Sequence, residues 1–304
     1  MNKKVALALA SGGPRGFAYI GAIEELLARG YEISSIAGVS AGSLVGGIYA
    51  AGGLQAFKEW LFGLDPMKVV SLMDFSVSKN YLVKGEKVIS AIKERVPDVN
   101  IEDLPIPFTA VATDLYTGEE VIFRKGPLFD AIRASISIPS MFKPVQIGGR
   151  TLVDGGMVNT FPLNRVERTP GDLLVGFNVN QIDAAEIQGF LDSRAALQRE
   201  KADKNFLGRI ETTMQELRLV VDAAEDHLPV NASDNVVKIL QRSFGIMNCT
   251  IARMGIALTP PDILVDLPFD TYHGVYGYSH APEIAERGRA LMAQALDRYE
   301  QSHA

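Results

Sequence analysis

Two consecutive strand–turn–helix patterns occupy the first fifty residues, and they constrain the fold more than any other feature of the chain. Val5–Ala10 is an apolar run that ends at the glycine-rich SGGPRG, and apolar side chains then recur at helical spacing until Gly30. The pattern repeats when the short apolar stretch Ser34–Val39 meets Ser40 and the small-residue segment Ala41–Ala51. Successive units of this kind predict an α/β fold: three layers, with a mostly parallel central sheet flanked by helices.

The rest of the chain continues the alternation of strands and helices. Apolar runs predict strands at 108–115, 119–123, 173–180 and in ILVDLPF, and a hairpin at 145–156 that turns at Gly148-Gly149. Helical periodicity predicts helices at 127–138, 184–228, 235–258 and 282–299. With no linker or repeat, we expect a single domain of residues 1–304, with a core at about 3–180 and helical additions plus a closing strand and helix at about 181–304.

The composition excludes several classes of function. The 304 residues carry a formal net charge of −6 and no run of five basic residues, so the electrostatics of a nucleic-acid binder are missing. The single Cys249 cannot form an internal disulfide, and the four scattered histidines indicate no local zinc site, so we expect no metal and no cofactor. The opening MNKKVALALA imitates a secretion signal, but its apolar run is shorter than the roughly 7 to 15 residues of one. We expect a cytoplasmic protein without a membrane-spanning helix, and its oligomeric state stays open.

The stretch GVSAGS places Ser40 between two glycines at a predicted strand-to-helix turn. A sharp turn of this type exposes a serine oxygen beside backbone N–H groups, as acyl transfer requires. Gly38 and Gly42 avoid clashes where strand and helix approach each other, and the N–H of Ala41 would face a developing oxyanion. The pattern indicates a nucleophilic serine, although GxSxG by itself also occurs in ordinary turns.

The earlier loop SGGPRG lies at the same predicted edge of the sheet. It matches neither a P-loop, which needs Gly-Lys-Ser or Gly-Lys-Thr, nor a dinucleotide site, which needs GxGxxG and an acidic residue after the second strand. We interpret it as an oxyanion hole in which the N–H groups of Gly12 and Gly13 are donors and Arg15 is a supporting positive charge.

Two kinds of base could activate Ser40. His273 and His280 lie in YHGVYGYSHAPE, which indicates a surface loop, and either would give the acid and histidine order of an α/β-hydrolase. Asp154 lies at the end of a predicted strand, in LVDGGMVN, where Gly155 and Gly156 allow a sharp turn. An Asx-type turn, in which Asp154 only caps its own backbone, is the structural alternative.

The segments GGPRG, GVSAGS, IRASISIPSMFKPV and LVDGGMVNTFP occur in the order found in the patatin-like phospholipase family, and the chain resembles that family over about residues 3–180. PPDILVDLPF and the final helix also resemble the close of bacterial members. The resemblance implies a patatin-like fold and a Ser-Asp dyad without histidine, with Ser40 as nucleophile and Asp154 as general base. It also implies that the loop with Gly12, Gly13 and Arg15 is the oxyanion site. Ser11 stands where the family has glycine and affects the first turn of that loop.

The resemblance implies a lipid acyl hydrolase or carboxylesterase of the phospholipase A type. IRASISIPSMFKPV would form a wall near the site or pack the core, and the aromatic and methionine-rich residues 54–75 would line an acyl groove, touch a lipid surface transiently or pack the core. The alternatives are a Ser-His-Asp carboxylesterase that uses His273 or His280, and a regulatory or binding module with little turnover. A histidine base would give an acid limb near pH 6.5, and an aspartate base is expected to give a lower one.

Overall fold

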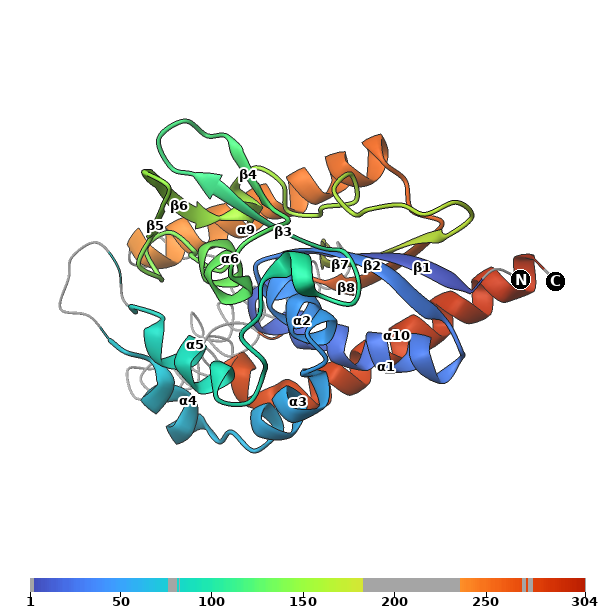
Figure 1. The fold of residues 1–304 in the computed structure, drawn as a ribbon, viewed down its shortest axis with the longest axis horizontal. Coiled ribbons are helices and arrows are strands. Elements are labelled where there is room, and N and C mark those ends of the chain that lie inside the picture. Colours follow the sequence, from blue (N-terminus) through green and yellow to red (C-terminus); the bar gives the residue numbers. More distant parts are fainter. Residues whose placement is uncertain are drawn as a thin grey trace, which may run out of the picture.

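The computed structural model describes residues 3–75, 81, 83–182, 236–269, 272 and 276–303. One eight-stranded sheet lies at its centre (Figure 1). Its strands are β1 (Lys4–Leu9), β2 (Glu32–Val39), β3 (Phe108–Asp114), β4 (Glu120–Phe123), β5 (Val145–Ile147), β6 (Arg150–Asp154), β7 (Leu173–Gln181) and β8 (Ile263–Pro268).

The strand order is β5-β6-β3-β2-β1-β7-β8, and β4 also pairs with β3. Strands β3, β2, β1, β7 and β8 are parallel to their neighbours in this series, whereas β4 and β6 run antiparallel to β3 and β5 runs antiparallel to β6. The prediction of a mostly parallel sheet is therefore confirmed. The antiparallel strands are confined to one side of the sheet, where the hairpin of β5 and β6 delivers Asp154 toward β3.

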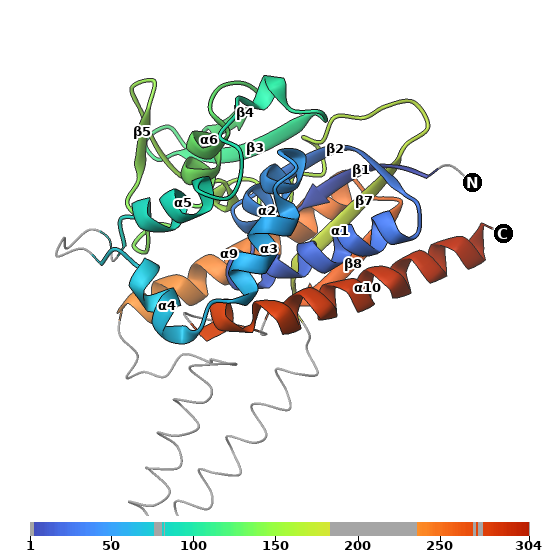
Figure 2. The same ribbon diagram turned by 60° about the horizontal axis from the view of Figure 1, so that its bottom comes forward.

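Helices cover both faces of this sheet. The α-helices are α1 (Ala18–Ala28), α2 (Ala41–Ala50), α3 (Leu54–Phe62), α4 (Pro66–Leu72), α5 (Glu86–Lys93), α6 (Leu128–Ser135), α9 (Val236–Leu258) and α10 (Ala281–Ser302). Short 3-10 helices are η1 (Gly13–Phe17), η2 (Ile101–Asp103), η3 (Gly155–Met157) and η4 (Tyr276–His280). Helices α1 and α10 run side by side on one face, and α9 crosses the other (Figures 1 and 2).

The central strand β1 shows how the sequence builds these layers. Its alternate residues Val5, Leu7 and Leu9 point into the large apolar core shared with α1, α2 and α10. The intervening Ala6 and Ala8 face a second, smaller core that includes Ala252 of α9. Small side chains on that face let α9 lie close to the sheet, so a fully apolar strand serves two layers at once.

Several element boundaries differ from the sequence prediction. The helix predicted over 127–138 ends at Ser135, because Ser135 and Ser137 turn to bond neighbouring strands instead. The 54–75 segment breaks into α3 and α4 at the Asp65-Pro66 pair, where Asp65 caps α4. The predicted helix over 184–228 lies outside the described residues.

Among the helices that the structure describes, none has both the length and the apolar character to cross a bilayer.

Candidate active site

Ser40 lies at the turn between β2 and α2, with φ 52° and ψ −121°. A non-glycine residue with positive φ is strained, and such strain is characteristic of functional turns. Both flanking residues must be glycine because the backbone of neighbouring residues lies too close for a side chain. A Cβ on Gly38 would lie 2.3 Å from the carbonyl oxygen of Gly42, and a Cβ on Gly42 would lie 2.2 Å from the carbonyl oxygen of Leu9. The local sequence therefore holds the serine at the carboxyl edge of the sheet.

Ser135, at the end of α6, anchors this turn. The N–H of Ser40 donates to Ser135 Oγ at 2.9 Å, and Ser135 Oγ donates to the carbonyl of Val111 at 2.6 Å. The N–H of Ser40 is therefore occupied and is not a donor for a substrate. Sequence reasoning treated this segment only as a wall or as core; the available signal was a pair of serines between apolar residues in RASIS.

Asp154 ends β6 at the level of Ser40. Val39, the residue before Ser40, pairs with Val111 of β3. Ala112, which follows Val111 on β3, pairs with Asp154. Its backbone is held on both sides: its N–H donates to the carbonyl of Ser137 at 2.9 Å, and its carbonyl accepts from Thr113 Oγ1 at 3.0 Å. The last residue of α6 thus fixes the serine turn, and Ser137, two residues later, fixes the aspartate.

The two carboxyl oxygens of Asp154 have different surroundings. Oδ1 accepts from the N–H of Gly156 at 2.8 Å, which is the Asx-type cap considered from the sequence. Oδ2 is buried and has no hydrogen-bond partner of ordinary length among the described residues. The cap therefore uses only one oxygen and leaves the other available for chemistry.

Burial raises the pKa of the Asp154 carboxyl to about 7, because the charged form loses its hydration. The hydroxyl of Ser40 and the N–H of Gly156 act on the same carboxylate and lower the pKa in part. The effect on the pKa places the Ser40 hydroxyl within interacting reach of the Asp154 carboxyl. Ser40 and Asp154 therefore interact, although 114 positions separate them in the sequence.

The turn after Asp154 packs against both the sheet and the glycine loop. A Cβ on Gly155 would lie 2.3 Å from the carbonyl oxygen of Val111, so this residue must be glycine for the turn to form. A Cβ on Gly156 would lie 3.0 Å from Ser11 Oγ. Ser11, which stands where the family has glycine, thus lies beside the turn that follows Asp154.

The glycine loop approaches the serine turn through Gly16, whose Cβ would lie 2.3 Å from that of Ala41. Gly12 lies against Val179 of β7 in the same way, and Gly13 has φ 56°. Among the described residues, none accepts a hydrogen bond from the N–H groups of Gly12, Gly13 or Ala41. Three backbone donors are therefore available at this edge of the sheet.

Arg15 is buried and ties the glycine loop to the far strands. Its Nε donates to the carbonyl of Val179 at 3.0 Å, and one terminal nitrogen donates to the carbonyl of Phe269 at 2.8 Å. The guanidinium also lies 4.8 Å from the centre of the Phe269 ring. These bonds anchor the loop, while the positive charge remains close enough to lower the pKa of Tyr278.

The stretch interpreted as a surface loop is partly structured. Within it, η4 packs on the glycine loop: Phe17 and Tyr278 meet edge to face at 5.8 Å. Burial raises the pKa of Tyr278 to about 12, and the nearby charge of Asp154 contributes to the rise. His280 precedes α10 as its N-cap residue, and His273 lies outside the described residues.

The 54–75 segment divides into a buried and an exposed part. Phe57 of α3 is buried, and Trp60 is half-buried with the Arg95 guanidinium 5.3 Å from its ring. In contrast, Met67 of α4 is 81% exposed and the nearby Phe75 is also exposed. Helix α4 packs on η4, which in turn packs on η1 of the glycine loop.

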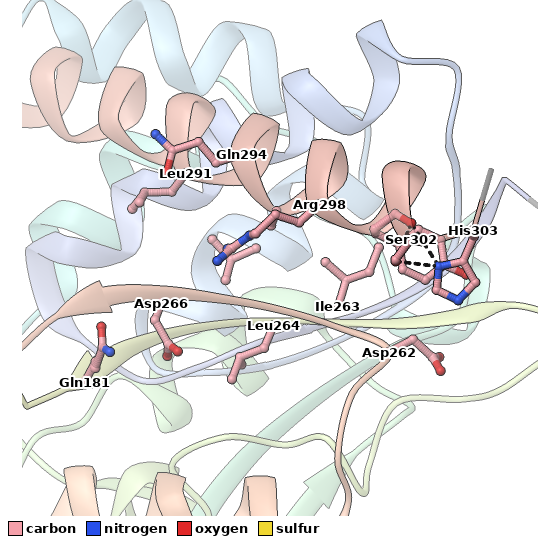
Figure 3. Close-up of a pocket in the computed structure, with 13 residues that line it drawn as sticks. Gln181, Asp262, Ile263, Leu264, Asp266, Leu291, Gln294, Arg298, Ser302 and His303 are labelled. Atoms are coloured by element: carbon pink, nitrogen blue, oxygen red, sulfur yellow. Dashed lines mark hydrogen bonds between the residues drawn. The ribbon is translucent and has the colours of Figure 1, made fainter.

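A separate groove of about 620 Å³ lies between α10 and the edge strand β8 (Figure 3). Its lining includes Asp262, Asp266, Arg298 and His303. None of the candidate catalytic residues lines it, so it is distinct from the site at the carboxyl edge of β1 and β2.

The chain is similar to known proteins over most of its length. A model of the family described as patatin-like phospholipase matches residues 7–166. An uncharacterized NTE family protein of Mycobacterium tuberculosis is 36% identical over 98% of this chain and 93% of its own length. Patatin-like phospholipase domain-containing protein 7 of Mus musculus is 26% identical over 62% of this chain and 14% of its own length. The crystal structure of VipD from Legionella pneumophila aligns with a TM-score of 0.48 and 14% identity, over 98% of this chain and 67% of that one.

Proposed function

This chain belongs to the patatin-like phospholipase family, and we propose that it is a serine acyl hydrolase with a catalytic dyad of Ser40 and Asp154. In this proposal Ser40 is the nucleophile and Asp154 is the general base. The N–H groups of Gly12, Gly13 and Ala41 form the oxyanion hole. The substrate is a carboxylic ester of a lipid, cleaved in the manner of a phospholipase A.

The observation that carries the proposal is the buried carboxylate of Asp154, which has one uncommitted oxygen and interacts with the Ser40 hydroxyl. An ordinary aspartate, with a pKa of about 3.9, is a poor base for a serine hydroxyl. A pKa of about 7 brings the carboxyl close to the operating pH, which is where a general base is most effective.

The reaction follows from these positions. Ser40 Oγ attacks the ester carbonyl carbon while its proton passes to Oδ2 of Asp154, and the carbonyl oxygen becomes an oxyanion. Donors of the proposed hole stabilise that charge, and each is worth about 10²- to 10³-fold in rate. Asp154 then gives the proton to the departing alcohol. Water, activated by the same carboxylate, hydrolyses the acyl-enzyme and restores Ser40.

Arg15 supports this chemistry without contacting the reacting atoms in our proposal. Its bonds to the carbonyls of Val179 and Phe269 hold the loop that carries Gly12 and Gly13. We therefore assign it as a positioning residue whose charge adds to the field at the site.

Two substitutions test the dyad on a short-chain p-nitrophenyl ester. Ser40→Ala and Asp154→Asn should each lower kcat/KM by at least about 10³-fold, since removing one member of such a unit removes most of its contribution. Asp266→Asn is a matched control, because burial also raises the pKa of Asp266 but this residue lies at the separate groove. It should keep nearly full activity.

Histidine variants and the wild-type rate distinguish the alternatives. The dyad predicts that His273→Ala combined with His280→Ala keeps most of the activity, and a loss comparable to that of Ser40→Ala would assign the base to histidine. Equal background rates for the wild-type protein and Ser40→Ala, over a panel of lipid and soluble esters, would favour a binding module. The same panel identifies the preferred head group and chain length.

A further inference from the structure

The outward face of α9 carries a stripe of exposed apolar side chains. Ile246, Met247, Met254 and Leu258 are all exposed, Met254 by 59% and Leu258 by 81%. At 3.6 residues per turn, these positions fall on one side of the helix, together with the exposed Thr250. Exposed apolar residues that are contiguous, rather than scattered, mark an interaction surface.

The inward face of the same helix is committed to the fold. Cys249 and Ala252 are buried, Ala252 against the alanine side of the sheet, and a Cβ on Gly245 would lie 2.2 Å from the Phe269 ring. The exposed stripe is therefore not a misplaced core face. Helix α9 therefore has two apolar faces, one buried against the sheet and one exposed.

The charge of α9 is opposite in sign to that of the whole chain. Residues Val236–Leu258 include Lys238, Arg242 and Arg253 but no aspartate or glutamate, whereas the chain has a formal net charge of −6. The exposed Arg253 lies along one border of the apolar stripe, whereas the guanidinium of Arg242 lies 5.0 Å from the centre of the Phe269 ring. Cationic residues beside an apolar face are typical of helices that lie in the interface of an anionic membrane.

Helix α9 is also connected to the candidate site. It packs against β7 and η3, the short helix that follows Asp154. Thr160 Oγ1 lies 3.3 Å from Asn248 Oδ1 of α9 and donates to the carbonyl of Gly156 at 3.0 Å. Gly156 in turn donates to Asp154 Oδ1. A surface bound by α9 would thus lie one layer of structure away from the aspartate turn.

We propose that the outward face of α9 docks on an anionic lipid surface, with the apolar stripe inserted among the acyl chains and Arg253 near the head groups. The role of this docking, bringing ester substrate to the site, rests on the proposed function, but the binding itself does not. Two copies that met through this face would bring their cationic residues together, so charge favours an anionic lipid surface over a contact between two α9 helices.

The test is sedimentation with sucrose-loaded vesicles of three parts phosphatidylcholine to one part phosphatidylglycerol, with Ser40→Ala as the background so that lipid is not consumed. Adding Met247→Gln, Met254→Gln and Leu258→Gln together should weaken binding by about tenfold or more, because the inserted apolar area is lost. Arg253→Glu should weaken binding to these vesicles by a similar factor, and much less to pure phosphatidylcholine. The control is Met67→Gln with Val70→Gln, which removes exposed apolar residues from α4 instead.

The outcomes separate this proposal from the catalytic one. Loss of binding in the α9 variants but not in the α4 control supports it. It is overturned if the protein without the α9 substitutions does not bind the vesicles, if the α9 variants bind as well as that protein, or if only the α4 control loses binding. A dimer in light scattering that the triple variant converts to monomer would also overturn it, by showing that the stripe joins two copies.

An activity measurement keeps the two proposals apart. In protein that retains Ser40, the triple substitution should leave hydrolysis of a soluble short-chain ester unchanged. If no variant hydrolyses the ester, the result counts against the proposed function and not against docking.

Discussion

Burial changes what the Asp154 carboxyl can do near neutral pH. From the sequence, an aspartate base was expected to place the acid limb of the pH profile below that of a histidine. The structure moves that expectation upward, because burial raises the pKa of the Asp154 carboxyl, which has a single backbone donor, to about 7. The pH profile by itself therefore does not distinguish aspartate from histidine, and substitution is needed.

The first prediction is a pH–rate profile with an acid limb centred near pH 7. Below that pH Asp154 is protonated in the free enzyme and cannot accept the proton of Ser40, so kcat/KM should fall about tenfold per pH unit well below pH 6. The measurement is kcat/KM for a soluble ester in buffers of constant ionic strength from pH 5 to pH 9. His280→Ala should leave the midpoint unchanged, whereas a midpoint below pH 5 would contradict the buried carboxylate as base.

The second prediction concerns stability. The pKa of Asp154 is about 7 in the folded protein and about 3.9 in the unfolded chain, so its contribution to stability is fully present below pH 4 and is lost as the pH rises toward 7. Asp154→Asn does not ionise and escapes this loss. Its free energy of unfolding relative to wild type should increase between pH 4.5 and pH 8, by at most about 4 kcal/mol. Urea denaturation at both pH values measures the difference; equal differences at the two pH values would contradict the shifted pKa.

Local patterns predicted the residues that depend on local geometry. Gly38, Ser40 and Gly42 form the predicted turn because its requirements lie within five adjacent residues. Proximity of Asp154 to Ser40 could not be derived that way, since it depends on the order of β6, β3 and β2 in the sheet. The resemblance to a family supplied that pairing, and residue spacing alone left histidine and aspartate open.

At the scale of elements, the end of α6 is where sequence reasoning missed most. Continuous helical periodicity predicts a helix to residue 138, but the Ser135 hydroxyl donates to the carbonyl of Val111 on β3, and the backbone carbonyl of Ser137 accepts from the N–H of Asp154. Short polar side chains can compete in this way with helix continuation. Nothing in a single sequence shows whether such serines face solvent or a neighbouring strand.

The third prediction tests that element. Ser135→Ala removes the acceptor for the Ser40 N–H and the donor to the buried carbonyl of Val111, which should cost about 1 to 3 kcal/mol of stability. If Ser135 also positions the turn, kcat per folded molecule should fall about tenfold or more with KM nearly unchanged. Ser90→Ala, at an exposed position of α5, is the matched control and should change neither quantity. An unchanged kcat would limit Ser135 to a purely structural role.

At the scale of the whole molecule, the sequence predicted the fold class and most strands, because buried parallel strands have long apolar runs. It did not predict that β8 extends the sheet beside β7, or that α10 lies along α1 (Figure 2). Both contacts join residues far apart in the chain, and they depend on packing surfaces instead of local periodicity. The C-terminal segment is therefore part of the same core as the strand that leads to the glycine loop.

The last prediction concerns this joining of the two ends of the chain. Helix α1 directly follows the glycine loop, and α10 approaches it so closely that a Cβ on Gly288 would lie 1.9 Å from the carbonyl oxygen of Ala18. Backbone on both sides cannot give way without moving a helix, so Gly288→Val should lower the free energy of unfolding by about 3 kcal/mol and Tm by roughly 5 °C or more. Ala290→Val inserts the same side chain at an exposed position of α10 and should cost only about 0.5 kcal/mol. Thermal unfolding by circular dichroism compares the two variants. Equal Tm values would mean that the contact between α1 and α10 is not part of the cooperative core, whereas a selective loss for Gly288→Val would show that the helix nearest the glycine loop is held in place by the other end of the chain.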